Sequence, residues 1–187
     1  MGKIILASAS PRRRELFSLI TKDFTVIPST AEEIVPDGVE ILKYAEYLAA
    51  QKAREIAAKY PENVVVGADT AVIAEGIILG KPKNKQDAKR MINLLSGKTH
   101  RVVTGCAVIK GSKFHSFSSV TEVEFYALYD DEIERYINTD EPYDKAGGYG
   151  IQGGAALFVK KICGDYFNVV GLPVAQLYHL LKNENYI

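Results

Sequence analysis

The chain has 187 residues, of which 47% are hydrophobic, and its 23 lysines and arginines balance 23 acidic residues. This length and apolar content predict one globular domain, or two closely fused lobes, with a substantial core. Zero net charge and the lack of a long basic tract argue against a general nucleic-acid or membrane-surface binder, although local positive charge would suffice for one phosphate ligand. Without a signal peptide or a membrane-spanning apolar run, the sequence predicts a cytoplasmic protein.

Apolar periodicity and turn residues predict an alternating order of strands and helices. This order indicates an α/β fold, a mixed sheet with helices on its faces. The predicted elements are a strand at 3–7, a helix at 11–20 with Leu16, Phe17, Leu19 and Ile20 inward, a strand at 24–27, a helix at 40–59, strands at 64–73 and up to Leu79, a helix at 85–95, a hairpin of 101–110 and 113–126, a helix at 130–138 capped by Asp130-Asp131, a strand at 156–162 and a helix at 173–182.

The start of the chain carries the most informative pattern. An apolar strand ends in a small turn with Ser8 and Ser10, and Pro11 then opens a helix with Ser10 as its N-cap. Arg12, Arg13 and the next arginine crowd the first helical turn, where the helix dipole is already positive. Cations are unfavourable there unless an anion lies between them, so the turn predicts a phosphate site. A solvated basic turn is the alternative.

Asp69 interrupts the apolar run of residues 64–73, although aspartate is depleted in strands. A buried carboxylate must be paired, hydrogen-bonded or bound to a metal. The residue is therefore predicted to be catalytic or metal-binding, unless it ends the strand and caps a turn at Gly67. Lys52 is a similar misfit, since it shares a helical stripe with apolar residues. Its side chain either extends along the helix rim or reaches a phosphate.

Other polar positions are ambiguous from spacing alone. Glu33 stands in an acidic pair that suits a solvated loop equally well, and Lys81 precedes Pro82 in an ordinary turn sequence. The segment Ser96-Gly97-Lys98-Thr99 is not a P-loop, because the required upstream glycine is missing and the helix precedes the strand.

Cysteine and histidine positions give no sign of a disulfide or a zinc site. Cys106 and Cys163 lie in separate strand-like contexts, which predicts reduced core thiols. His100, His115 and His179 lack the spacing of zinc ligands.

The glycine-rich stretch at 140–154 is the second informative segment. Glycines at this density let the backbone approach a ligand closely or turn through positive φ. Asp144 and Lys145 could pair, and Gln152 can both donate and accept, as recognition of a base edge requires. A purely structural loop is the alternative.

These pieces together resemble the Maf family of nucleoside triphosphate pyrophosphatases, also called septum formation inhibitors. The resemblance covers essentially the whole length of the chain. Six motifs in the same order carry it: residues 6–13 (LASASPRR), 66–70 (VGADT), 80–82 (GKP), 96–100 (SGKTH), 141–153 (EPYDKAGGYGIQG) and 171–173 (GLP).

The resemblance implies a fold similar to the inosine-triphosphate pyrophosphatases, a long twisted mixed sheet with helices and two lobes around a cleft, within a single domain of residues 1–187. It implies a homodimer, a divalent cation (Mg²⁺ or Mn²⁺), and hydrolysis of a nucleoside triphosphate to the monophosphate and pyrophosphate. The loop sequence looks like the branch that acts on dTTP and UTP. One departure is Gly148, where family members often carry alanine.

The resemblance also implies a role for each matching residue. Asp69 would be the general base for water attack at the α-phosphorus and, with Glu33, a metal ligand. Phosphate binding would fall to Ser8, Arg13, Lys52 and Lys81, with Arg12 near the phosphates or the base. Thr70 and Gln152 would help to select the base.

Two other functions are compatible with the same motifs. A nucleotide-responsive regulator of cell division would bind triphosphates and a division partner without turnover. A general phosphatase would release inorganic phosphate first. The product of the reaction discriminates among the three.

Overall fold

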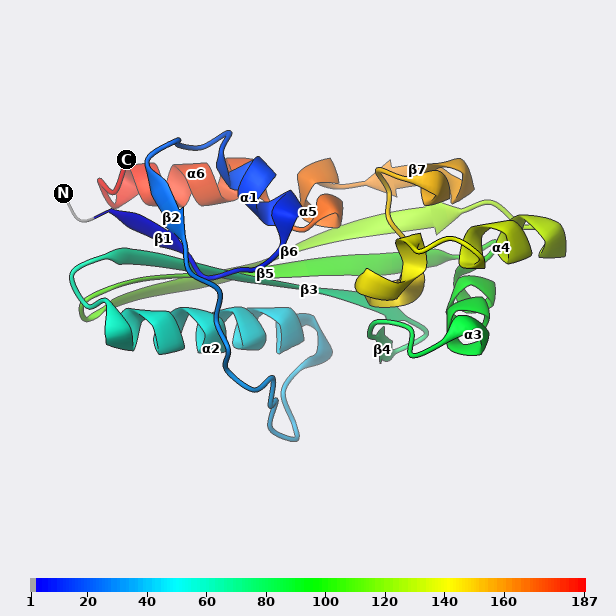
Figure 1. Ribbon diagram of the computed structural model, residues 1–187, viewed down its shortest axis with the longest axis horizontal. Coiled ribbons are helices and arrows are strands. Elements are labelled where there is room, and N and C mark those ends of the chain that lie inside the picture. The colour runs from blue at the N-terminus through cyan, green and yellow to red at the C-terminus, as the bar shows by residue number, and fades with distance from the viewer. Residues whose placement is uncertain (1–2) are drawn as a thin grey trace. The chain divides into compact units, whose positions relative to one another are not determined.

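The computed structural model describes residues 3–187, which form a seven-stranded mixed sheet with flanking helices (Figure 1). In chain order its elements are β1 (Ile4–Leu6), α1 (Pro11–Phe17), β2 (Phe24–Val26), α2 (Tyr44–Lys59), β3 (Val64–Ala74), β4 (Ile77–Leu79), α3 (Lys85–Leu95), β5 (Thr99–Lys110), β6 (Lys113–Phe125), α4 (Asp130–Ile137), β7 (Val159–Cys163), α5 (Tyr166–Val170) and α6 (Val174–Asn183), with short 3-10 helices at Ile41–Lys43, Glu141–Asp144, Ala146–Gly148 and Gly154–Phe158.

The sheet has the strand order β2-β1-β3-β5-β6-β7, with β4 paired to β3 outside this path. β1 pairs in parallel with both β2 and β3, whereas β4 on β3 and β7 on β6 are antiparallel. The predicted α/β class, a mixed sheet flanked by helices, is therefore confirmed. No helix among residues 3–187 is both long and apolar enough to cross a membrane.

Several predicted boundaries and contacts are wrong. α1 ends at Phe17 instead of residue 20, and Leu19, expected inward, is 63% exposed. α4 is capped by Tyr129, whose backbone N–H donates to Glu132, and not by the aspartate pair. Cys163, expected in the core, is exposed.

The last part of the chain also differs. Residues 154–158 form a 3-10 helix, so β7 begins at Val159 and not at Ala156, and α5 was not predicted. In contrast, α3 has the predicted bounds, because Asn84 caps it and accepts a hydrogen bond from the Asp87 amide at 2.9 Å.

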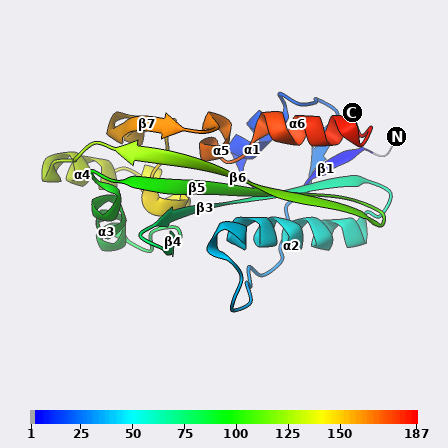
Figure 2. The same ribbon diagram turned by 180° about the vertical axis from the view of Figure 1, so that it is seen from behind.

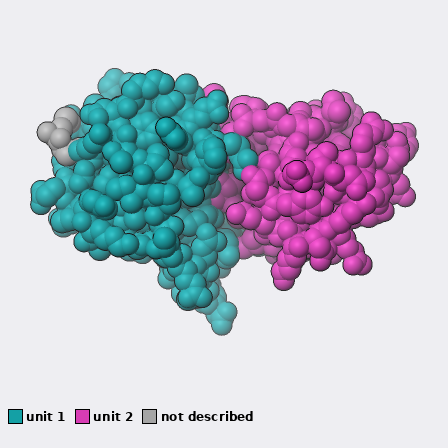
Figure 3. Space-filling model, in the orientation of Figure 1, with its two compact units in different colours: residues 1–69, 104–119, 171–187 teal, residues 70–103, 120–170 magenta. Residues whose placement is uncertain are grey.

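The chain divides into two compact units (Figure 3). Strands β3, β5 and β6 each contribute residues to both. Unit 1 comprises residues 1–69, 104–119 and 171–187, and unit 2 comprises residues 70–103 and 120–170.

Unit 1 holds helix α2 very close to the sheet. α2 covers one face of the strands, and α1 and α6 cover the other (Figures 1 and 2). A side-chain Cβ at Gly67 would lie 2.3 Å from the carbonyl oxygen of Ala49, and one at Gly105 would lie 2.2 Å from the amide nitrogen of Glu46. Glycine is required at both positions because helix backbone occupies the space of a side chain.

Unit 2 has its own apolar core, in which α3 and α4 lie side by side. His100 on β5 is buried there, and its Nε2 lies 2.7 Å from the hydroxyl of Tyr149. The rings of Phe125 and Tyr149 contact the imidazole edge to face. Burial lowers the pKa of His100 to about 4, so the side chain is neutral at neutral pH.

We expect the free energy of unfolding to fall as the pH drops below 6.5. The histidine of the unfolded chain takes up a proton near pH 6.5, whereas folded His100 does so only near pH 4. The stabilisation that comes from neutral, buried His100 is fully present above pH 6.5, and about 2 kcal/mol of it is lost by pH 5. Urea unfolding at pH 7.5 and pH 5 measures this change. The pH dependence must shrink in His100→Gln, and an undiminished dependence in this variant would contradict the assignment.

Candidate active site

The turn between β1 and α1 forms as predicted. Ser10 caps α1, with its hydroxyl accepting from the amide of Arg13 at 3.4 Å, and Pro11 is the first helical residue. The hydroxyl of Ser8, which is only 5% exposed, accepts from the amide of Ser10 at 3.3 Å and from Nη1 of Arg13 at 3.4 Å. Nε of Arg13 donates to the carbonyl of Gly171 at 2.9 Å. The contact with Gly171 thus fixes the Arg13 guanidinium on one side, and the contact with Ser8 fixes it on the other.

The guanidinium of Arg13 is a partly desolvated cation. Burial lowers its pKa, and the neighbouring carboxylate of Asp69 opposes that effect. Arg12, in the same helical turn, is half-buried and lowers the pKa of Arg13 further by charge repulsion. An anion bound beside these two guanidinium groups would relieve the repulsion.

Lys52 joins two carboxylates from different parts of unit 1. Its Nζ lies 2.5 Å from Oδ1 of Asp69 on β3 and 2.7 Å from Oε1 of Glu33 in the loop after β2. The side chains of Lys52 and Asp69 are only 16% and 14% exposed, whereas that of Glu33 is 57% exposed. This cluster is a nearly buried ion pair with one carboxylate toward solvent.

The structure resolves two ambiguities of the sequence. Lys52 lies on the buried stripe of α2 between Leu48 and Ile56, but its ammonium pairs with carboxylates instead of reaching solvent. Asp69 does not end a strand beside Gly67, because β3 continues to Ala74. The interpretation of Asp69 as a turn cap is therefore wrong.

Two residues of α2, one helical turn apart, hold the loop that carries Glu33. One oxygen of Glu55 accepts from the amides of Thr30 and Ala31 at 2.8 and 2.9 Å, and Nε2 of Gln51 donates to the carbonyl of Ile34 at 2.6 Å. Glu33 is thus fixed on both sides by the helix that bears Lys52. These anchors were not predicted, and their spacing of four residues is the only sequence signal.

The Glu55 carboxylate is strongly stabilised in its charged form. Hydrogen bonds lower its pKa to about 2, with Lys59 contributing most, followed by Ser29 and Thr30. Its Oε2 also accepts from the hydroxyl of Ser29 at 2.5 Å, and its Oε1 accepts from the hydroxyl of Thr30 at 3.0 Å. The loop therefore remains tied to α2 over the whole physiological pH range.

The other predicted residues, Thr70, Lys81 and Gln152, belong to unit 2. Thr70 is half-buried on β3, while Lys81 and Gln152 are exposed. The turn with Lys81 lies beside the glycine-rich loop, because the amide of Gly147 donates to the carbonyl of Gly80 at 3.0 Å.

The glycine-rich loop has the internal ion pair expected from its sequence, since Nζ of Lys145 lies 2.5 Å from Oδ1 of Asp144. Gly148, the position that departs from the family pattern, has a φ of +71°. A Cβ there would approach Pro82 to 3.0 Å. Both the positive φ and the close approach to Pro82 favour glycine at this position.

The donor set around Lys52 suits a divalent cation such as Mg²⁺ or Mn²⁺. Asp69 and Glu33 provide hard carboxylate oxygens that already approach one positive charge. Within residues 3–187, no three or more histidine, cysteine, aspartate or glutamate side chains form a ready-made metal site. One or two carboxylates completed by phosphate oxygens are, however, a usual way to hold Mg²⁺ in proteins.

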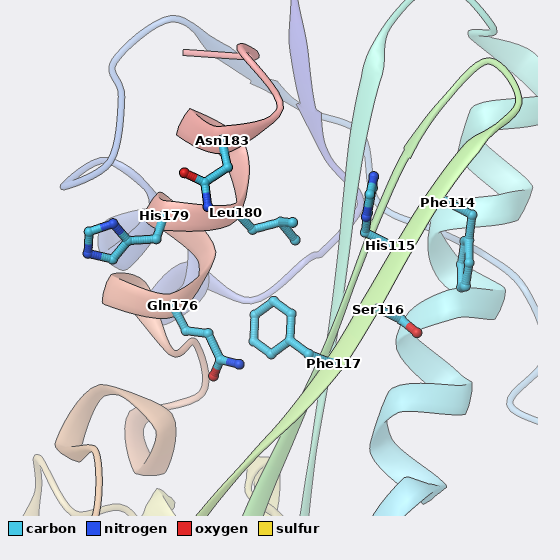
Figure 4. Close-up of a pocket in the computed structure, with 8 residues that line it drawn as sticks. All are labelled: Phe114, His115, Ser116, Phe117, Gln176, His179, Leu180 and Asn183. Atoms are coloured by element: carbon cyan, nitrogen blue, oxygen red, sulfur yellow. The ribbon is translucent and has the colours of Figure 1, made fainter.

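A cavity of about 600 Å³ in unit 1 contains none of the predicted site residues (Figure 4). Phe117 and Leu180 extend toward each other from β6 and α6. Among residues 3–187, the lining has aromatic, aliphatic, imidazole, hydroxyl and amide groups and no carboxylate, ammonium or guanidinium group. The lining residues are Phe114, His115, Ser116, Phe117, Gln176, His179, Leu180 and Asn183.

Comparison with known sequences decides the family. The sequence profile of the family described as Maf-like protein matches residues 3–184. The chain belongs to the Maf family. A Maf relative named dTTP/UTP pyrophosphatase, from Bacillus pumilus (strain SAFR-032), is 48% identical over 182 residues, which cover 97% of this chain and 96% of that protein. One of the same name from Bacillus anthracis is 49% identical over 185 residues, covering 99% and 97%.

Two solved structures show the same fold. The Ham1 protein of Staphylococcus aureus aligns with a TM-score of 0.57 at 16% identity and covers 97% of this Maf chain and 98% of that chain. A HAM1 protein from Coxiella burnetii aligns with a TM-score of 0.54 at 15% identity, covering 98% and 100%. At this identity the similarity concerns the fold alone, and it confirms the predicted fold class.

In this Maf protein we expect Glu55→Ala to release the loop of Glu33. The amides of Thr30 and Ala31 would lose a charged acceptor, so their hydrogen exchange should accelerate by roughly tenfold or more. Lys59→Ala is the matched control, because it removes a partner of Glu55 but none of the loop contacts. Unchanged exchange in Glu55→Ala, or equal acceleration in both variants, would show that Glu55 does not anchor the loop.

Proposed function

We propose that this chain hydrolyses dTTP and UTP to the monophosphate and pyrophosphate. The observation that carries the proposal is near-full-length identity of 48–49% to proteins named dTTP/UTP pyrophosphatase. The Lys52–Asp69–Glu33 cluster beside Ser8 and Arg13 supports it, since it combines carboxylates with donors for phosphate oxygens.

In unit 1 the family resemblance suggests a role for each residue, and the chemistry of each side chain is compatible with that role. Ser8, Arg13 and Lys52 supply donors and positive charge to the triphosphate, and Arg12 lies in the same turn as a further cation. The carboxylate of Asp69 accepts the proton of the water that attacks the α-phosphorus, and pyrophosphate leaves. Most of the rate enhancement comes from positioning and charge neutralisation, because phosphoryl-type transfer requires little covalent chemistry from the protein.

A divalent cation, Mg²⁺ or Mn²⁺, would be held by Glu33 and Asp69. When bound, it would neutralise charge on phosphate oxygens. Both carboxylates contact the Lys52 ammonium, which holds them close together, and the anchored loop keeps Glu33 near Asp69.

In unit 2, Lys81 contributes a further phosphate-binding cation, and Thr70 and Gln152 select the base. Gln152 is suited to this role because its carboxamide carries both a donor and an acceptor. Residues 1–187 would act as a single domain, since three strands contribute to both units. The family resemblance further favours a cytoplasmic homodimer.

The first test is the product formed from each nucleotide. With Mg²⁺ or Mn²⁺, we expect pyrophosphate and monophosphate from dTTP and UTP, and much less from CTP, GTP and 7-methyl-GTP. Asp69→Asn keeps the shape but loses the base and a ligand charge, so kcat should fall by at least about 10²–10³. Binding of dTTP without turnover would favour the division regulator, and inorganic phosphate as first product would indicate a general phosphatase.

A matched pair of lysines tests the role assigned to unit 2. Lys81→Ala should lower kcat by about 10²–10³, because a donor to developing negative charge is lost. Lys83→Ala, two residues away and equally exposed, should keep near-wild-type activity. Both variants should have wild-type melting temperatures, since neither side chain is packed in the core. Full activity of Lys81→Ala would remove this residue from the site.

A further inference from the structure

The turn that carries Gln152 is tied at both ends to one carboxylate. The amide of Gly154 donates to Oε2 of Glu141 at 2.8 Å. At the other end, the amide of Gly150 donates to the hydroxyl of Tyr136 at 3.2 Å, and this hydroxyl donates to Oε1 of Glu141 at 3.1 Å. Glu141 therefore holds one end directly and the other through a tyrosine. We call this arrangement the Glu141 tether.

Between these ends the backbone makes a tight turn. The amide of Gly153 donates to the carbonyl of Gly150 at 3.1 Å, which places Ile151 and Gln152 at the two central positions. Ile151 is half-buried and Gln152 is exposed. The turn thus presents the carboxamide of Gln152 to solvent from a fixed backbone.

The backbone of this turn lies directly against the tether. A Cβ at Gly153 would come within 2.3 Å of Oε1 of Glu141, and one at Gly150 within 2.6 Å of Cε of Lys145. Nζ of Lys145 in turn donates to the backbone carbonyl of Glu141 at 2.7 Å. Neither glycine has a positive φ, so their role here is close approach: a Cβ at either position would displace the end of the Glu141 or Lys145 side chain.

The hydroxyl of Tyr136 is protonated and fixed in position within the tether. It is only 5% exposed, and burial raises the pKa of its phenol, so the hydroxyl keeps its proton and donates to Glu141. Its ring packs edge to face on Phe158 with centroids 5.1 Å apart. The hydroxyl position is therefore set by the core of unit 2.

A carboxamide discriminates between pyrimidines only if it is held in one orientation. Uracil and thymine offer an N–H donor beside a carbonyl acceptor, whereas cytosine offers an acceptor beside an amino donor. By exchanging its oxygen and nitrogen, a freely moving glutamine can match either edge. A fixed turn sets the position from which the Gln152 side chain approaches the base, and so reduces the number of poses in which its carboxamide can match the cytosine edge.

We propose that Glu141 and Tyr136 are positioning residues for base selection, and that their tether lets Gln152 distinguish a thymine or uracil edge from a cytosine edge. The inference rests on the proposed function, in which Gln152 reads the base. In this role Glu141 and Tyr136 act on the base through the position of Gln152.

Two adjacent glycines provide a matched test. Gly153→Ala places a methyl group against the carboxylate of Glu141, whereas a Cβ at Gly154 would meet Glu141 and Tyr136 at an ordinary 3.4 Å. We expect Gly153→Ala to lower the ratio of kcat/KM for dTTP over CTP about tenfold, mainly by raising KM for dTTP, with kcat within about twofold. Gly154→Ala should keep the wild-type ratio.

Tyr136→Phe tests the tether without adding atoms. It removes only the hydroxyl, so it should fold even if Gly153→Ala does not, and it should reduce discrimination in the same way. In Glu141→Ala the clashing carboxylate is gone, and adding Gly153→Ala should change the ratio no further. Equal losses of kcat/KM for dTTP and CTP in Tyr136→Phe would indicate a merely structural role and overturn the proposal.

The hydrogen-exchange rates of the Gly150 and Gly154 amides measure whether the tether is intact, independently of any activity assay. Faster exchange in Tyr136→Phe together with reduced discrimination supports the proposal. Faster exchange with unchanged discrimination overturns the role of the tether in base selection while the enzyme remains active. If the wild-type chain hydrolyses no nucleotide at all, the proposed function fails first, and the role in base selection fails with it.

Discussion

The ion cluster of Lys52 with Asp69 and Glu33 is the interaction on which the candidate active site depends. It brings a helix, a strand and a loop to one point and leaves only Glu33 largely open to solvent. Two partly buried charges are costly to desolvate, so this arrangement is weak evidence for stability. Its geometry suits ligand chemistry instead, because a cation and a polyphosphate can replace the contacts that the ammonium and carboxylates now make with each other.

In each unit a glutamate carboxylate holds a loop that carries a predicted site residue. In unit 1 the carboxylate of Glu55 accepts from backbone amides of the loop that bears Glu33. In unit 2 the carboxylate of Glu141 binds the turn that bears Gln152. A carboxylate can accept several hydrogen bonds at once, and charged acceptors make these bonds stronger than neutral ones. In each unit one carboxylate thus fixes a short segment together with a second side chain, which is Gln51 in unit 1 and Tyr136 in unit 2.

Local patterns in the sequence predict much of this structure. Helix α3 has its predicted bounds because its N-cap residue, its apolar stripe and the turn that follows it all indicate the same ends. The Ser10 cap of α1 and the position of Pro11 follow from the same helix rules. The anchors Glu55 and Glu141 could not be predicted this way. Glu55 meets residues 24 to 26 positions away, a contact set by tertiary packing, and its four-residue spacing from Gln51 does not indicate what it binds. Leu19 was wrongly predicted to face the core because α1 ends at Phe17, so the helical periodicity no longer applies at residue 19.

The close approach of α2 to the sheet restricts how sequences of this kind can change. Where the strands carry Gly67 and Gly105, the helix presents its backbone together with alanines such as Ala49. Any larger residue on either side would push the helix outward and carry the Lys52 ammonium with it. Because the atoms closest to the two glycines are helix backbone, shortening a side chain on α2 cannot make room there, and both positions must remain glycine while α2 keeps its place. Positions on the solvent face of α2 are free of this constraint.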